Sequence, residues 1–140
     1  MVHERETGIE TYTEKPGYRF AWVDKEFKET NPEEYDWLIV PGGRSPEYIR
    51  TYREMEKIVK HFFEKNKPVA AICHGPLVLT AYGLVKGRNL TSHGTLKLDI
   101  EVMGGKFEDR EVVVDRNLVT SRAWYDLPTF MREFLKLLKK

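Results

Sequence analysis

The sequence predicts an α/β fold with a mostly parallel sheet, and three observations point to it. Two short apolar runs, Trp37–Val40 and Val69–Ile72, have the continuous hydrophobicity of strands that are buried on both faces. The segment between them repeats apolar residues at the spacing of an amphipathic helix. Strands and helices then continue to alternate along the chain, which is typical of layered α/β domains. The chain has 140 residues, a length that predicts one domain with a substantial core.

Composition and charge exclude several classes of protein. Hydrophobic residues make up 41% of the chain and aromatic residues 12%, which argues against disorder. The net charge is +1, from 23 Lys and Arg against 22 Asp and Glu, so nothing favours a nucleic-acid partner. No apolar run approaches the roughly 18 residues of a membrane-spanning helix, and residues 1–10 lack the apolar core of a secretory signal. We therefore expect a cytoplasmic protein that binds neither nucleic acid nor membrane.

The beginning of the chain differs in character from the rest. Residues 1–17 are polar without a clear period, so we expect an atypical or partly ordered segment there. Tyr18–Val23 alternates well enough for a short strand. Asn31 and Pro32 suit the N-cap and the first position of a single helical turn.

Two helices are expected around the second buried strand. The helix before it has apolar residues at i, i+3, i+4, i+7 and i+8. These residues are Met55, Ile58, Val59, Phe62 and Phe63. Asn66–Pro68 ends that helix. The helix after the strand runs from Gly75 to Tyr82, with Pro76 in its first turn and Gly83 beyond its end.

The C-terminal half predicts four further elements. Asn89–Ser92 is a candidate third strand, and Leu96–Met103 reads as a short helix. Glu111–Asp115 and Leu118–Ser121 predict a hairpin. The last amphipathic helix contains Phe130, Met131, Phe134, Leu135 and Leu138. Ligands in such α/β sheets bind beyond the carboxyl ends of the strands, so that edge is where we expect the site.

Cys73 lies at that edge. It is the only cysteine, which excludes an internal disulfide and a multi-cysteine metal site, and nothing in the sequence indicates a metal or a cofactor. A strand, an abrupt turn and a helix follow one another here, an arrangement that exposes the side chain and favours a thiolate. The N–H groups of His74 and Gly43 are candidate donors to an oxyanion. The alternative is that Cys73 simply ends a buried strand as a small hydrophobic residue.

The segment Ala-Ile-Cys-His-Gly-Pro, residues 71–76, resembles the nucleophile elbow of the PfpI intracellular protease family. That family belongs to the ThiJ/PfpI, class I glutamine amidotransferase-like superfamily. Further stretches resemble it in the same order: Asp36–Gly43, Arg44–Glu47, Gly83–Arg88, Asp109–Asp115 and Thr120–Arg122. The resemblance covers residues 16–140. It implies that residues 1–140 form a single PfpI-like domain, a flavodoxin-like three-layer sandwich that is truncated at the N-terminus.

The resemblance also implies a function and the roles of several residues. It implies a cysteine-dependent hydrolase, either an intracellular peptidase or an enzyme of deglycase or glyoxalase type, acting on a peptide or a small carbonyl substrate. Cys73 matches the nucleophile and His74 the neighbouring base or orienting residue, while the N–H groups of Gly43 and His74 match the oxyanion hole. Glu47 matches a glutamate that, in hexameric members, reaches the histidine of an adjacent subunit. Without the resemblance, Glu47 would be interpreted as a solvated surface carboxylate.

Two features near the expected pocket differ from PfpI-like members. His93 stands where those members commonly have Tyr, and the related deglycase-like branch has His at about this place. His93 is therefore either a second acid or base of the pocket or a half-exposed loop histidine. Ala123-Trp-Tyr125 replaces the usual small residues and proline, which predicts a changed pocket mouth or interface, or else extra packing for the last helix. The residues expected around the pocket are Gly42, Arg44, Gly75 and Trp124.

The N-terminal difference leads to the remaining expectations. The family opens with a βα unit whose loop supplies a glutamate to the nucleophile, but no apolar strand precedes Tyr18. The glutamates in the polar segment that takes its place are Glu4, Glu6, Glu10 and Glu14. We do not expect them to replace the family's glutamate. A sheet with an exposed edge favours a homo-oligomer, a dimer or a hexamer. Two alternatives to a fully active enzyme follow: a catalytically weak paralogue acting as a redox sensor, chaperone-like or interaction protein, or a shortened sequence of an ordinary PfpI-like enzyme.

Overall fold

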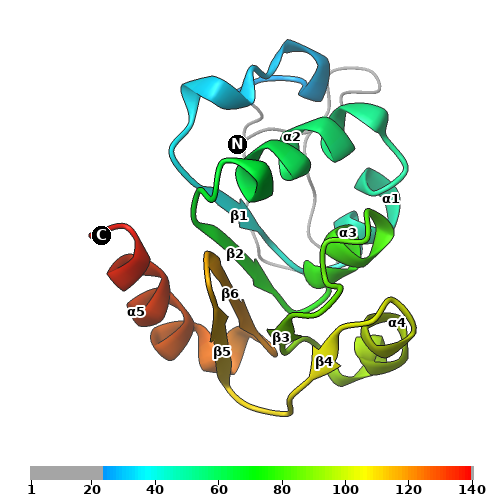
Figure 1. The fold of residues 1–140 in the computed structure, drawn as a ribbon, viewed down its shortest axis with the longest axis vertical. Helices are drawn as coiled ribbons and strands as arrows, with labels where there is room; N and C mark the ends of the chain where they lie inside the picture. The colour runs from blue at the N-terminus through cyan, green and yellow to red at the C-terminus, as the bar shows by residue number, and fades with distance from the viewer. Residues whose placement is uncertain (1–23, 140) are drawn as a thin grey trace, which may run out of the picture.

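The structure is a computed structural model, and it describes residues 24–139. Its main sheet has four strands in the order β1-β2-β6-β5. The strands are β1 (Leu38–Val40), β2 (Val69–Ile72), β5 (Val112–Asp115) and β6 (Leu118–Ser121). β1, β2 and β6 run parallel, while β5 pairs with β6 in the antiparallel hairpin that the sequence predicts (Figure 1). The sheet is therefore mostly parallel, as expected. The predicted strand Tyr18–Val23 and the segment 1–17 lie outside the described residues.

Helices pack on both faces of this sheet. One face is covered by α2 (Arg53–Glu64) and α3 (Pro76–Ala81), and the opposite face by α5 (Leu127–Leu137) (Figure 1). This arrangement is the α/β three-layer sandwich expected from the sequence. The buried residues of α2 are Met55, Ile58, Val59 and Phe62, so four of the five residues in its predicted apolar stripe form the core side of the helix.

The central strand β2 shows why its sequence is apolar throughout. Val69 and Ala71 belong to the core cluster shared with α2 and α3. Ala70 and Ile72 point the other way, into the cluster that includes Phe130 of α5. Because successive side chains of a strand face opposite sides, a strand covered on both faces favours apolar residues throughout. A polar residue is accommodated where it has a hydrogen-bond partner, as Thr120 and Ser121 of the buried strand β6 have. All four residues of β2 are buried.

Three elements differ from the sequence prediction. The strand predicted at 89–92 ends at Leu90: β3 (Asn89–Leu90) pairs with β4 (Lys106–Phe107) in a separate two-stranded sheet. Beyond Leu90 the ladder to β4 stops, and the Thr91 N–H, which points away from β4, donates to Thr120 Oγ1 at 2.9 Å. β4 itself has no counterpart in the prediction. Nor does α1 (Ser45–Ile49), a five-residue helix with a proline in its first turn.

The remaining helical segments follow the prediction closely. A 3₁₀ turn at Gly94–Leu96 leads into α4 (Lys97–Val102), where one short helix was expected. Asn31 caps a 3₁₀ turn, Pro32–Glu34, by accepting a hydrogen bond from Glu33 N–H. Two other 3₁₀ turns span Phe27–Glu29 and Trp124–Asp126.

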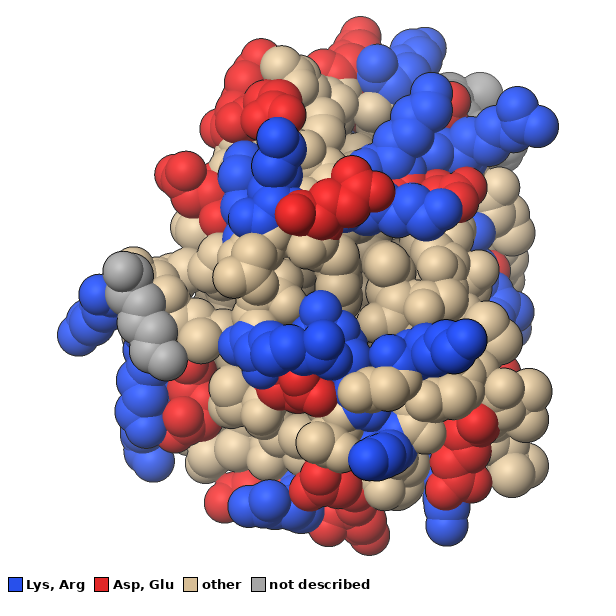
Figure 2. Space-filling model, in the orientation of Figure 1, with Lys and Arg blue, Asp and Glu red and all other residues tan. Residues whose placement is uncertain are grey.

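The surface is mixed in charge. Acidic and basic side chains lie side by side over the face shown in Figure 2, so neither sign dominates it. Within residues 24–139, no helix combines the length and the apolar character needed to cross a membrane.

Candidate active site

Cys73 occupies a strained turn between β2 and α3. Its φ is +61°, in the left-handed region that residues with a side chain rarely adopt. Backbone hydrogen bonds hold the turn on both sides. The Cys73 N–H donates to the Ser121 carbonyl of β6 at 3.0 Å, and the Gly75 N–H donates to the Ile72 carbonyl at 2.8 Å. The turn thus lifts the thiol out of the sheet at the carboxyl edge of the parallel strands.

Two glycines allow the strand ends to approach closely around Cys73. A Cβ on Gly75 would lie 2.4 Å from the Val40 carbonyl oxygen and 2.9 Å from that of Ile72. A Cβ on Gly42 would lie 2.6 Å from the Cβ of Cys73. Neither glycine is among the residues that line the cavity described next. Instead, each lies where a side chain would collide with Cys73 or with the neighbouring strand ends, so the missing Cβ leaves room for the elbow.

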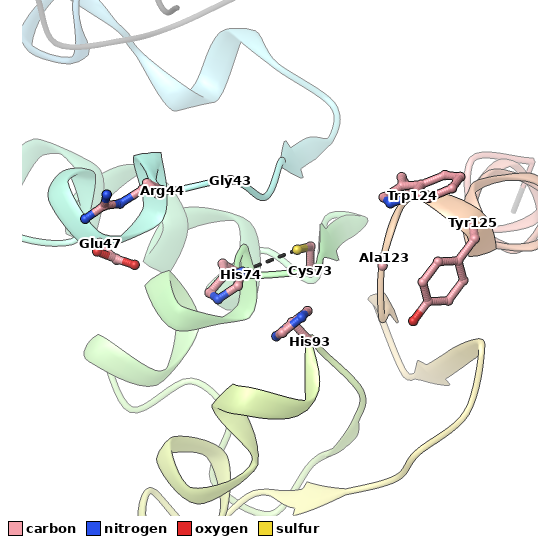
Figure 3. A pocket seen from close by; sticks show the side chains of 9 residues that line it. All are labelled: Gly43, Arg44, Glu47, Cys73, His74, His93, Ala123, Trp124 and Tyr125. Atoms are coloured by element: carbon pink, nitrogen blue, oxygen red, sulfur yellow. Dashed lines mark hydrogen bonds between the residues drawn. The ribbon is translucent and has the colours of Figure 1, made fainter. Parts of the chain in front are cut away.

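A cavity of about 380 Å³ opens above the thiol. It is lined by Gly43, Arg44, Glu47, Cys73, His74, His93, Ala123, Trp124 and Tyr125. Figure 3 shows Arg44 and Glu47 on one side of Cys73, and Trp124 and Tyr125 on the other. The fold therefore brings all four expected catalytic residues, together with Gly43, Arg44 and Trp124, to a single cavity, although they come from four separate parts of the chain.

The thiol lies against an imidazole ring. Cys73 Sγ is 3.3 Å from His74 Nδ1. The His74 ring stacks on the His93 ring, with centroids 4.8 Å apart and planes 21° apart (Figure 3). Burial and, to a lesser degree, the neighbouring His93 lower the pKa of His74, while Glu47 acts in the opposite direction. His74 is therefore held in its neutral form around neutral pH, the form that can accept a proton from the thiol.

The backbone N–H groups expected to bind an oxyanion have no partner among the described main-chain carbonyls. No carbonyl of residues 24–139 accepts a hydrogen bond from the N–H of Gly43 or His74. The N–H of Cys73 itself is engaged by Ser121. Gly43 has φ +76°, a conformation that glycine adopts without strain.

An ion-pair network supports the aromatic side of the cavity. Arg122 donates to both carboxylate oxygens of the buried Asp126, at 2.9 and 3.2 Å, and to Asp109 at 3.1 Å. These two carboxylates raise the pKa of Arg122, whose guanidinium also lies 5.7 Å from the centre of the Tyr125 ring. Trp124 is 72% exposed and lines the cavity, and it is not among the residues packed in the core cluster of α5.

Thr95 is the residue of the site that sequence reasoning missed. Its hydroxyl lies 2.8 Å from His93 Nδ1 and 3.3 Å from His74 Nε2. A hydroxyl two residues after a histidine is a weak signal, and nothing in the sequence relates it to His74, 21 positions away. In the described part of the chain, no three His, Cys, Asp or Glu side chains gather in a way that could hold a metal ion.

Comparison with known proteins identifies the family. Residues 3–137 match the sequence model of the DJ-1/PfpI family. The chain belongs to the DJ-1/PfpI family. Two archaeal relatives are 48% identical over 127 residues, which cover 91% of this chain and 76% of each relative. They are Deglycase TK1284 of Thermococcus kodakarensis and Deglycase PfpI of Pyrococcus furiosus.

Solved structures agree with this assignment. A two-domain protein of Anabaena variabilis, with a DJ-1/ThiJ/PfpI-like and a ferritin-like domain, has a TM-score of 0.87 and 34% identity. The match covers 93% of this chain and 37% of that protein. The fold of the chain is thus the flavodoxin-like fold of the DJ-1/PfpI family, and the elbow at Cys73 lies inside the matched region.

Proposed function

We propose that this DJ-1/PfpI protein is a cysteine-dependent hydrolase of deglycase type, which acts on carbonyl adducts of the kind that glyoxals form. The observation that carries the proposal is the position of Cys73 Sγ, beneath an open cavity and 3.3 Å from His74 Nδ1. The names of relatives that are 48% identical to the chain over 127 residues support the deglycase type.

The first chemical step uses groups of the chain alone. His74 Nδ1 takes the thiol proton, and the sulfur forms a bond to the carbonyl carbon of the substrate. The electron pair of the C=O bond moves to the oxygen, which becomes an oxyanion. The N–H groups of Gly43 and His74 bind this oxyanion. Where the attacked carbon carries an amine, the C=O bond re-forms, the C–N bond breaks, and the imidazolium of His74 gives its proton to the leaving amine. Water then adds to the same carbon, and the C–S bond breaks, which releases the product and restores the Cys73 thiol.

The charges around the cavity agree with this step. Because its pKa is lowered, His74 starts as a neutral base. Glu47 lies close enough to favour the imidazolium that forms when the proton moves. His93 stacks on the same ring and opposes a second positive charge there. The site thus suits a single proton moving between sulfur and imidazole.

The test compares wild-type protein with Cys73→Ala and Cys73→Ser on methylglyoxal, on a methylglyoxal-modified amine, and on a fluorogenic peptide. We expect the wild type to consume the two carbonyl substrates, and both variants to lose that activity while keeping the wild-type circular dichroism spectrum. Serine is a matched control of similar size, but its hydroxyl ionises far less readily than a thiol. Equal rates for wild type and Cys73→Ala would remove Cys73 from the mechanism, whereas cleavage of the peptide alone would favour a peptidase over a deglycase.

We also propose that the protein forms a homo-oligomer. Within residues 24–139, β1 has a ladder only to β2, and an open strand edge is a natural surface for association. Trp124 of the cavity lining is 72% exposed, and Tyr48, which follows Glu47 in α1, is 60% exposed. We propose that a second subunit covers this surface and that Glu47 of one subunit lies against a histidine of the other. Size-exclusion chromatography with light scattering should give a dimer or hexamer at micromolar concentration, and a monomer under those conditions would contradict the proposal.

A further inference from the structure

The turn that follows β3 brings a second histidine and a hydroxyl against the proposed base. The His93 N–H donates to the Cys73 carbonyl at 2.9 Å, which ties this turn to the elbow. The Thr95 hydroxyl then lies between the two imidazoles, 2.8 Å from His93 Nδ1 and 3.3 Å from His74 Nε2. With the contact of 3.3 Å between His74 Nδ1 and Cys73 Sγ, these groups form one continuous chain of hydrogen bonds.

The direction of one hydrogen bond in this series is fixed. The backbone N–H of Thr95 can only donate, and it donates to His93 Nδ1 at 3.4 Å. A nitrogen that accepts this bond carries no proton, so the neutral His93 ring has its proton on Nε2. The Thr95 hydroxyl must therefore act as the donor in its own contact with His93 Nδ1.

The polarity of the remaining bonds follows from this step. Because the Thr95 hydrogen points to His93, the contact with His74 uses a lone pair of the Thr95 oxygen. His74 Nε2 must supply the proton in that contact, so His74 has its proton on Nε2 and a bare nitrogen at Nδ1. This bare nitrogen faces Cys73 Sγ at 3.3 Å, where it can accept the thiol proton.

We propose that Thr95 is a positioning residue, whose hydroxyl fixes His74 in the tautomer that can deprotonate Cys73. The inference rests on the proposed function, because it explains why His74 can act as the base in that mechanism. When Nδ1 takes the thiol proton, the products are a thiolate and an imidazolium, and Thr95 continues to accept the hydrogen bond from Nε2. Thr95 touches neither the thiol nor the substrate carbonyl in this scheme; it acts only through His74.

The first test measures the tautomers directly. In ¹⁵N-labelled protein, at a pH well above the ordinary imidazole pKa of about 6.5, the ring nitrogens of His74 and His93 are assigned with single-histidine variants. We expect a protonated Nε2 and a bare Nδ1 in the neutral ring of both residues. In Thr95→Val, the two His74 nitrogen shifts should move toward each other, whereas Thr95→Ser should keep the wild-type pattern. A bare His74 Nε2 or a protonated His93 Nδ1 in the wild type would overturn the proposal.

The second test measures the thiol without any substrate. The rate of alkylation of Cys73 by iodoacetamide should fall about threefold to tenfold in Thr95→Val, the effect expected when one hydrogen bond of ordinary strength is lost. Thr95→Ser should react at the wild-type rate. A matching decrease in Thr95→Ser would mean that the methyl group, and hence packing, is responsible, and the proposal would fail.

These measurements separate the inference from the proposed function. If methylglyoxal is not consumed but the tautomers and the alkylation rates follow the expectation, the substrate is wrong and the role of Thr95 stands. If the enzyme is active on carbonyl substrates, Thr95→Val should lower kcat and leave KM unchanged, because the hydroxyl contributes to proton transfer alone. An active Thr95→Val enzyme with wild-type kcat and wild-type alkylation rate would show that Thr95 has no such role.

Discussion

The nucleophile and its surroundings are held by two different kinds of structure. Cys73 is placed by buried backbone: its φ of +61°, its hydrogen bond to Ser121 and the close approach of Gly42 and Gly75 leave little freedom. The groups around it, which we call the wall, include Thr95, which contacts the two histidines, and Trp124, which lines the cavity; both side chains are exposed. The elbow is therefore built together with the folded core, whereas the wall adjusts the chemistry of a site that the core has already formed.

The largest effect should come from adding one methyl group beneath the elbow. In Gly75→Ala, the new Cβ would meet the Val40 carbonyl oxygen at 2.4 Å, and neither backbone can move without breaking strand contacts. We expect the free energy of unfolding to fall by about 3 kcal/mol, as measured by urea denaturation. Gly94→Ala is the matched control, because a Cβ there meets nothing within 4 Å. Similar losses in the two variants would mean that the elbow is no more constrained than the wall.

The same contrast explains what the sequence could predict. Strands β1 and β2 were predictable because burial on both faces favours a continuous apolar run, and the elbow was predictable because it follows directly from the end of β2. The short helix α1 was not, because only Pro46 and Ile49 of its five residues are buried. Such a helix leaves no periodic stripe to detect.

Contacts of polar side chains with groups far away in the sequence are the second kind of feature that could not be predicted. β3 was expected to run to Ser92, but its ladder to β4 ends at Leu90, and the Thr91 N–H donates to a side-chain oxygen, Thr120 Oγ1 of β6. The contact between Thr95 and His74 is of the same type: two polar groups 21 positions apart meet in space. Hydrophobic periodicity contains no information about such pairs. The sequence therefore predicts the scaffold and the nucleophile better than it predicts the wall that orients the base.

A smaller effect is expected on the pH dependence of activity. Hydrolysis requires neutral His74, so kcat/KM should fall as the pH drops through the pKa of that residue. Because burial and His93 lower this pKa, activity should persist below the ordinary histidine value of about 6.5. His93→Asn removes a potential positive charge, which should move the acidic limb to higher pH. Glu47→Gln removes an opposing charge, which should move it to lower pH. Shifts of about one pH unit or less are expected. If both variants moved the acidic limb of the pH profile in the same direction, His74 would not be the group that sets it.

The smallest effect on stability should come from the cavity mouth. Trp124 is 72% exposed, so Trp124→Ala should change the free energy of unfolding by no more than about 0.5 kcal/mol. Its indole lines the cavity on the side away from His74. If it holds substrate away from the reacting atoms, its loss should raise KM severalfold without lowering kcat. Leu98→Ala, at a residue 71% exposed and outside the cavity lining, should change neither quantity. A lower kcat in Trp124→Ala would show that the cavity mouth affects the nucleophile. An equal rise of KM in Leu98→Ala would show that the effect is not specific to the cavity. Either result would contradict the separation of elbow and wall.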